Sequence, residues 1–219
     1  MTQETEKVSS KSERTRQRIL HAAAQAFRQH GYTSSSLRDI AENAGMQAGS
    51  LYYHFDSKED LAEAVMDEGV LGAEQAARQA VAALGEHANP IDRIEAAFRG
   101  HLGYLLREAD FAVATLRMLH QTPDGVRMRH LRKQRAFGRF YAELFEDAQR
   151  AGLIRREFHL GALRMLLLGA LNWSPEWFDP NGLSPDELVG QLSAMIRHGV
   201  MPENVATVGE KGARGQARA

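Results

Sequence analysis

Helix-capping signatures, separated by apolar residues at helical spacing, recur along almost the whole 219-residue chain. Ser36 with Asp39 pairs an N-cap hydroxyl with an acid three residues later, and Asn89-Pro90 places proline at a first helical position. One helical face is marked by apolar residues at i, i+3, i+4, i+7 and i+8, namely Ile19, Ala22, Ala23, Ala26 and Phe27. Almost no stretch alternates apolar and polar residues as a half-buried strand does. The pattern therefore predicts an all-α fold of about nine helices.

The expected helices group into two domains, with polar segments at both ends of the chain. We expect a flexible arm at 1–11, a helix-turn-helix domain at 12–56, a larger helical domain at 57–202 and a disordered tail at 203–219. The tail is rich in glycine, lysine, arginine and alanine and has no apolar periodicity. The longest strongly apolar stretch, 165–171, is far too short to cross a bilayer, and the N-terminal segment lacks the apolar core of a signal peptide. We therefore expect a cytoplasmic protein that does not enter a membrane.

The composition argues against several classes of function. The chain contains no cysteine, which removes disulfides and thiolate metal sites. Its nine histidines show no metal-ligand spacing. We find no nucleophile–base pair and no phosphate-binding loop in the sequence. The sequence therefore predicts no catalytic residues, no metal and no other cofactor, and it argues against an enzyme.

The segment 37–54 reads as two short helices joined by the turn Ala44-Gly45-Met46-Gln47, where glycine lets the chain turn sharply. In such a helix-turn-helix, the second helix enters the major groove of DNA and the first crosses the phosphate backbone. Leu51 and Phe55 can point inward because they are four residues apart. The residues left for the outer faces suit backbone hydrogen bonding and groove contact: Gly49, Ser50, Tyr52, Tyr53 and His54.

Local charge supports this interpretation. Seven Lys and Arg stand against three Asp and Glu between residues 7 and 55, although the formal net charge of the whole chain is −1. Lys58 opens the next predicted helix, where its charge adds to backbone N–H groups aimed at a phosphate. The competing interpretation is a packed helical hairpin with surface aromatics. Buried packing, however, would not require Tyr52, Tyr53 and His54 together on so short a helix.

A longer pattern of residues surrounds this segment: Thr15-Arg16, Ile19-Leu20, Ala22-Ala23, Phe27, Gly31-Tyr32, Ser36-Leu37, Ile40-Ala41, Ala44-Gly45, Gly49-Ser50-Leu51-Tyr52-Tyr53-His54-Phe55, Ser57-Lys58-Glu59 and Leu61. This pattern resembles the DNA-binding domain of the TetR family of repressors. Its most specific part is the run Leu-Tyr-Tyr-His-Phe followed by Ser-Lys-Glu. The resemblance implies a homodimeric regulator that binds a palindromic operator in double-stranded DNA, and it assigns ligand binding and dimerisation to the domain at 57–202.

The resemblance also implies which residues contact DNA. Those expected at phosphates are Thr33, Ser36, Tyr52, His54 and Lys58. Those expected nearest base edges are Gln47, Ala48, Gly49, Ser50 and Tyr53. Two positions depart from the family pattern: Gln47 stands where Ser or Thr often caps the recognition helix, and Ala48 stands where Lys or Arg is common. The loss of a cation from the groove leaves the operator sequence beyond prediction.

The predicted helix at 160–178 is apolar around its whole circumference, so it must be covered on all sides. The last predicted helix offers a second apolar stripe. Two such helices from each subunit can form a four-helix bundle across a two-fold axis, as the resemblance also implies. The residues expected at this interface are Leu163, Leu167, Leu171, Leu188, Leu192, Met195 and Ile196. The alternative is that both helices serve only the core of a monomer.

The helices between 90 and 178 are expected to enclose a mostly apolar ligand cavity with a few polar groups. Candidate lining residues are Phe98, His101, Leu102, Leu105, Phe111, Thr115, Met118, Phe137, Phe140, Tyr141, Met165 and Trp173. The polar groups among them are His101, Thr115 and Tyr141. Taken alone, each of these residues fits ordinary core better than a ligand site, and it is the group that suits a pocket.

The class of ligand is indicated by a pattern near the C-terminal end: Leu171-Asn172-Trp173, Trp177-Phe178, Pro180, Gly182 and Ser184-Pro185-Asp186-Glu187-Leu188. It is similar to TetR-family regulators of fatty-acid and steroid catabolism, several of which respond to acyl-CoA thioesters. A basic run either receives coenzyme A phosphates or forms a solvated face paired with acids: Arg127, Arg129, Arg132, Lys133, Arg135 and Arg139. We expect a repressor released from DNA by a small apolar or acyl-CoA-type effector. The alternative is a DNA-binding protein of the same fold without an effector.

Overall fold

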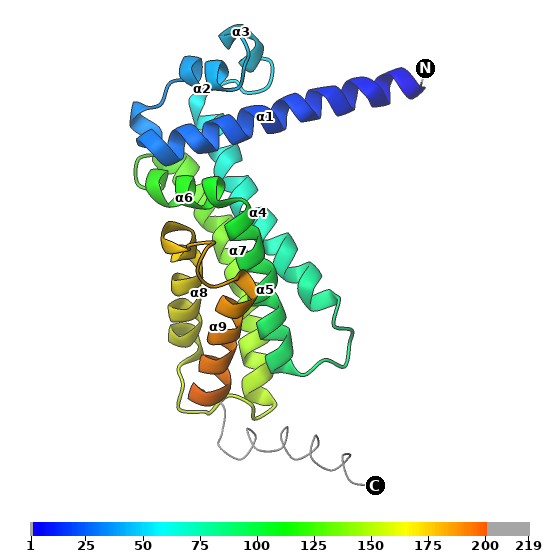
Figure 1. Cartoon of the computed structure of the whole chain (residues 1–219), viewed down its shortest axis with the longest axis vertical. Helices are drawn as coiled ribbons and strands as arrows, with labels where there is room; N and C mark the ends of the chain where they lie inside the picture. Colours follow the sequence, from blue (N-terminus) through cyan, green and yellow to red (C-terminus); the bar gives the residue numbers. More distant parts are fainter. Residues whose placement is uncertain (1, 201–219) are drawn as a thin grey trace. The chain divides into compact units, whose positions relative to one another are not determined.

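The computed structural model describes the backbone of residues 2–200 and the side chains of residues 11–200. This part of the chain contains nine helices and no strand (Figure 1), as predicted. The helices are α1 (Thr2–Ser34), α2 (Leu37–Asn43), α3 (Ala48–Leu51), α4 (Lys58–Ala82), α5 (Pro90–Arg107), α6 (Ala109–Met118), α7 (Asp124–Arg150), α8 (Leu160–Trp177) and α9 (Pro185–Gly199). The tail predicted at 203–219 lies outside the described residues.

The caps predicted at Ser36 and Asn89 begin α2 and α5, and Asn89 Oδ1 accepts the backbone N–H of Ile91 at 2.8 Å. Ser36 Oγ accepts the backbone N–H of Asp39 at 3.1 Å, and Ser184 forms a reciprocal capping box with Glu187. Helix ends depart from expectation in two places. The helix predicted at 48–54 ends at Leu51, and residues 52–54 continue as a turn. The segment 1–11, predicted to be a flexible arm, is helical from Thr2 onward; its Glu, Lys and Gln residues have high helix propensity.

The described residues form two compact units that do not follow the order of the sequence. The first unit contains residues 2–72 and Glu108–Arg135, and the second contains Ala73–Arg107 and residues 136–200. Helices α4 and α7 each contribute to both units. Helix α6, although it follows α5 in the chain, belongs to the first unit together with α1, α2 and α3.

The core of the first unit brings α6 together with the N-terminal helices. Helix α6 packs extensively against α1. Phe111 and Met118 of α6 are at most 1% exposed and belong to the same apolar cluster as Phe27, Leu51 and Met66. Because α6 supplies part of this cluster, the helix-turn-helix does not form a separate core from residues 12–56 alone.

The second unit is built around α5. Helix α5 packs against α8 and α9, and Arg197 of α9 pairs with Glu95 and Asp92 of α5, each at 2.7 Å. Gly100 lets α5 approach α4 closely, since a Cβ atom at this position would lie 2.3 Å from the carbonyl oxygen of Ala76. The result is a helical packing whose centre contains the aromatic residues of α5 and α7.

Candidate functional site

The helix-turn-helix is built from α2, the turn after it and α3. Gly45 in the turn adopts a left-handed φ of 68°, which glycine adopts without a Cβ penalty. Leu51 and Phe55 are buried, as predicted, with 0% and 5% of their surface exposed. Tyr53, in contrast, is 91% exposed. The Tyr53 ring therefore adds nothing to the core of the first unit.

The residues assigned to DNA contact lie on the outside of the first unit, with some half-buried. Those that are exposed are Thr33, Ser36, Gln47, Gly49, Ser50, Tyr52 and Tyr53. Those that are half-buried are Ala48, His54 and Lys58. The Ser36 hydroxyl also caps α2 and donates to Asp39 Oδ2 at 2.6 Å, so this side chain already has an internal role.

Lys58 is held close to Thr33 rather than extended into solvent. Its Nζ lies 4.4 Å from the centre of the Tyr32 ring and donates to the Thr33 carbonyl oxygen at 3.4 Å. Burial lowers the pKa of Lys58, and the neighbouring Glu59 opposes that shift. Burial, together with a 3.1 Å hydrogen bond to Glu59 and its charge, raises the pKa of Tyr32 to about 12. These contacts bring two candidate phosphate-binding residues, Thr33 and Lys58, together.

A set of polar contacts between α1 and the segment around α6 was missed by the sequence analysis. Arg28 pairs with Asp110 at 2.7 Å, and Arg117 donates to the carbonyl oxygen of Arg28 at 2.7 Å. Gln121 accepts the backbone N–H of Thr33 at 3.2 Å. Some eighty to ninety residues separate the partners in the chain, and no local pattern in the sequence marks them.

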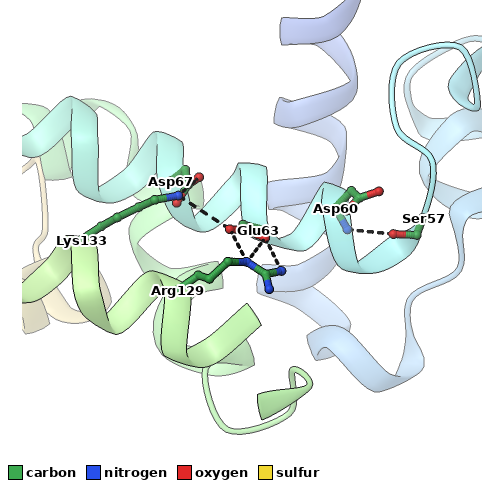
Figure 2. Close-up of polar contacts among 6 residues, drawn as sticks. All are labelled: Ser57, Asp60, Glu63, Asp67, Arg129 and Lys133. Carbon is green, nitrogen blue, oxygen red and sulfur yellow. Dashed lines mark hydrogen bonds and ion pairs between the residues drawn. The ribbon is translucent and has the colours of Figure 1, made fainter. Parts of the chain in front are cut away.

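The basic run on α7 is partly engaged with acids of α4 (Figure 2). Arg129 forms a bidentate ion pair with Glu63 at 2.5–2.8 Å, and Lys133 pairs with Asp67. The hydrogen bond from Arg129 is the main reason that the pKa of Glu63 is lowered. Within the run, Arg127 also pairs with Asp124 at 2.7 Å. The interpretation of a helix face paired with acids therefore holds for three of its six cations; Arg132, Arg135 and Arg139 are exposed.

Five of the candidate ligand-lining residues form an aromatic cluster in the second unit. His101 is 3% exposed, its ring centre lies 5.0 Å from that of Phe137, and its Nδ1 lies 3.2 Å from the Tyr141 hydroxyl. The Tyr141 hydroxyl donates its single proton to the Ala97 carbonyl oxygen at 3.1 Å, so Nδ1 of His101 must donate to Tyr141. Tyr141 also contacts the rings of Phe98 and Phe140.

Burial keeps both polar members of this cluster uncharged. It lowers the pKa of His101 to about 3 and raises that of Tyr141 well above its ordinary value. The neutral tautomer of His101 therefore carries its proton on Nδ1 and a lone pair on Nε2. The cluster is mostly apolar with two hydrogen-bonding groups, which is the chemistry expected of a site for a small organic ligand.

The remaining candidate ligand residues are divided among three places. Leu102 and Leu105 are buried on α5 with the cluster. The α6 residues Phe111 and Met118 belong to the core of the first unit, where the Thr115 hydroxyl donates to the Phe111 carbonyl oxygen. On α8, by contrast, Met165 and Trp173 are exposed at the surface: 62% and 56%.

The residues predicted at the dimer interface also differ in exposure. Leu167, Leu171 and Ile196 are buried within one subunit, and Leu163, Leu188 and Leu192 are half-buried. Met195 is 64% exposed. The apolar face that α8 leaves open carries Met165, Leu166, Trp173 and Trp177. This face and Met195 of α9 are the large apolar surface that these two helices leave exposed.

No helix among residues 2–200 has the combination of length and apolar character that crossing a bilayer requires. No three potential metal ligands of the His, Asp or Glu type come together among them.

The buried His101 predicts an acid-dependent loss of stability. Its pKa of about 3 in the folded chain lies below the value near 6.5 expected when unfolded, so the unfolded state binds the extra proton between these values. Above pH 6.5 His101 is neutral in both states and costs no stability. As the pH falls from 6.5 toward 3, the free energy of unfolding falls by about 1.4 kcal/mol per pH unit. Urea unfolding at pH 7.5 and 5.5 measures this difference in the free energy of unfolding.

Burial lowers the pKa of His130 too, so His130 contributes a pH dependence of the same sign. The variant His101→Phe should therefore lose only the part of the pH dependence that His101 contributes. Equal pH dependence in both proteins would contradict the assignment.

Two domain models of related regulators match different parts of the chain. The domain model for bacterial regulatory proteins of the tetR family matches residues 19–65, and that for the tetracyclin repressor-like C-terminal domain matches residues 87–200. The chain is 38% identical over 61 residues to the HTH-type transcriptional regulator TtgR of Pseudomonas putida, which is 28% of this chain and 29% of TtgR. It thus spans less than a third of that relative's length.

Two further relatives match over most of their length. The chain is 22% identical over 202 residues to the HTH-type transcriptional repressor KstR2 of Mycobacterium tuberculosis, covering 91% of this chain and all of KstR2. The crystal structure of AibR in complex with isovaleryl coenzyme A and operator DNA superimposes with a TM-score of 0.70 and 26% identity, covering 83% of this chain and 97% of AibR. The predicted resemblance to repressors of this kind is confirmed. Because the C-terminal domain model alone spans more than half of the chain, the protein belongs to the TetR family of bacterial transcriptional regulators.

Proposed function

We propose that this DNA-binding regulator is a homodimeric repressor that leaves a palindromic operator when a small apolar or acyl-CoA-type effector binds. The observation that carries the proposal is the open aromatic surface of the helix-turn-helix. Tyr52 and Tyr53 are 54% and 91% exposed, directly after a helix whose Leu51 is fully buried. These rings do not pack in the core of the protein, and in a complex with DNA they could contact the groove and its phosphates.

The chemistry of α3 and the residues around it suits this role. A Cβ atom at Gly49 would meet nothing within 4 Å, so base edges can approach the backbone there. The hydroxyls of Thr33 and Tyr52 and the imidazole of His54 offer donors to phosphate oxygens, and Lys58 supplies the positive charge. Gln47, Ala48, Ser50 and Tyr53 remain the candidates nearest the bases.

The open apolar face of α8 and α9 supports a dimer. Leu166 is 73% exposed, and Trp173 and Trp177 lie on the same side of α8. A second copy of the chain would bury this face around a two-fold axis. Two recognition helices related by that axis read half-sites about 34–36 Å apart, one turn of B-DNA. This is the geometry that a palindromic operator requires.

The aromatic cluster around His101 is the candidate effector site. Its rings provide apolar surface for an acyl chain or a ring system, and His101 and Tyr141 provide hydrogen bonds. KstR2 is a ketosteroid regulator, and AibR was crystallised with isovaleryl coenzyme A. Both relatives support an effector from this range of chemistry. A bound effector lowers DNA affinity only to the extent that it binds the two conformations of the dimer differently.

Substitutions on the open surface should weaken DNA binding without lowering stability. Tyr52→Phe and His54→Ala each remove one hydrogen bond to DNA, which predicts about a 2- to 10-fold loss of affinity. Fluorescence anisotropy on duplexes that the wild-type protein selects from random DNA measures the loss. His87→Ala, at an exposed position of the α4–α5 loop, is the matched control. Normal binding by both variants would show that this surface does not dock on DNA.

Acyl-CoA thioesters should dissociate the protein from its operator. A gel-shift titration with isovaleryl-CoA and longer acyl-CoAs should reduce DNA affinity 5- to 150-fold, the usual range of allosteric coupling. Free coenzyme A is the control for its charge. A complex that survives every acyl-CoA, with tryptophan fluorescence unchanged, would reject this effector class and favour a regulator without an effector. No sequence-specific complex at all would contradict the repressor.

A further inference from the structure

The peptide groups on both sides of Thr33 are held by two side chains from distant parts of the chain. The backbone N–H of Thr33 donates to Gln121 Oε1 at 3.2 Å. Its carbonyl oxygen accepts from Lys58 Nζ at 3.4 Å. Gln121 lies between α6 and α7, and Lys58 is the first residue of α4. The Thr33 backbone is therefore fixed although its own side chain is exposed.

The side chain of Gln121 is itself oriented by α6. Its Nε2 donates to the Arg117 carbonyl oxygen at 3.1 Å, and its backbone N–H donates to the Met118 carbonyl oxygen at 2.9 Å. With Nε2 engaged as a donor to one carbonyl, Oε1 is the atom left to accept from Thr33. The end of α6 thus determines where the acceptor for Thr33 lies.

Gly31 makes room for this contact. It interrupts the helical backbone of α1 with a φ of 74°, in the left-handed region that favours glycine. A Cβ atom at this position would lie 2.7 Å from Gln121 Oε1, closer than real Cβ atoms approach. The residue therefore permits both the turn of the chain and the close approach of the Gln121 carboxamide.

Two further contacts tie the end of α1 to α6. The Arg117 guanidinium donates to the Arg28 carbonyl oxygen at 2.7 Å, and Arg28 pairs with Asp110 at 2.7 Å. The Arg28 carbonyl oxygen lies three residues before the break in the helix at Gly31, and a side chain of α6 satisfies it, as the last carbonyls before a helix end require. Gln121 is thus the last of a series of contacts through which α6 holds the segment leading into the helix-turn-helix.

We propose that Gln121, which lies in the first unit but outside the segment 12–56 predicted to bind DNA, is a positioning residue for DNA binding: it fixes the Thr33 peptide so that the Thr33 hydroxyl meets an operator phosphate. The inference rests on the proposed function, in which Thr33 is a phosphate contact. It deepens that function by naming a residue 88 positions along the chain from Thr33 that holds this contact in place.

The test replaces Gln121 with methionine, which has a similar length but neither the acceptor nor the donor. Gln121→Met should weaken binding to the selected duplexes by about 2- to 10-fold, the effect of one neutral hydrogen bond. The matched control is Gln149→Met. Gln149 makes comparable side-chain bonds to the carbonyl oxygens of Arg155 and Phe158, but in the second unit. We expect this control to bind DNA as the wild type does, and both variants to lose similar amounts of stability in urea.

A double-mutant cycle separates positioning from a merely structural role. Thr33→Ala removes the hydroxyl and keeps the N–H that Gln121 binds. If Gln121 acts through the Thr33 hydroxyl, Gln121→Met costs no further DNA affinity in the Thr33→Ala background. Additive losses, or unchanged binding by Gln121→Met, would overturn the inference while the repressor stands. If the wild-type protein selects no duplex, the proposed function fails first and this inference with it. Gln121→Asn, whose shorter amide retracts from Thr33, serves if the methionine variant does not fold.

Discussion

The packing of α6 against α1 is the contact on which the arrangement of the first unit depends. Phe111 and Met118 supply α6 side chains to a core whose other members come mainly from α1 to α4. Full burial of side chains of this size contributes about 1.5–3 kcal/mol each. The half-buried ion pair of Arg28 with Asp110 remains open to solvent and adds less. The apolar contact, rather than the charges, makes α6 an integral part of the DNA-binding unit.

The boundary of the C-terminal family domain differs from the boundary of the two packing units. The C-terminal family domain matches residues 87–200, yet part of that range, including α6, packs with the helix-turn-helix. Helices α4 and α7 also contribute residues to both units. The ion pairs of Glu63 with Arg129 and Asp67 with Lys133 join α4 to α7 within the first unit (Figure 2), so these two helices are linked there.

The sequence predicted best what is encoded locally. Caps such as Ser36 and Asn89, the Gly45 turn and the inward positions of Leu51 and Phe55 follow from residues a few positions apart. The contact of Gln121 with Thr33 could not be found in this way, because its partners are 88 positions apart and neither belongs to a pattern. The length of α3 was overestimated because aromatic residues after Leu51 are compatible with either a helix or a turn.

The site residues of the C-terminal half show a different limit. A helix that is apolar on every side, as α8 is, gives no signal of which face meets its own core. Leu167 and Leu171 turned out to be buried within the subunit, whereas Leu166 and Trp173 are exposed. Periodicity likewise placed Phe111 and Met118 among apolar residues but could not say that their neighbours belong to α1. Such assignments depend on tertiary packing, which a single sequence does not contain.

Hydrogen–deuterium exchange of the full-length protein tests most directly whether α6 is part of the DNA-binding unit. With rising urea concentration, the backbone amides of α6 should exchange through the same opening as those of α1, because the two helices share one core. Their opening free energies should converge, while the amides of α5 follow those of α8 and α9. Exchange of α6 together with α5, and independently of α1, would contradict the account.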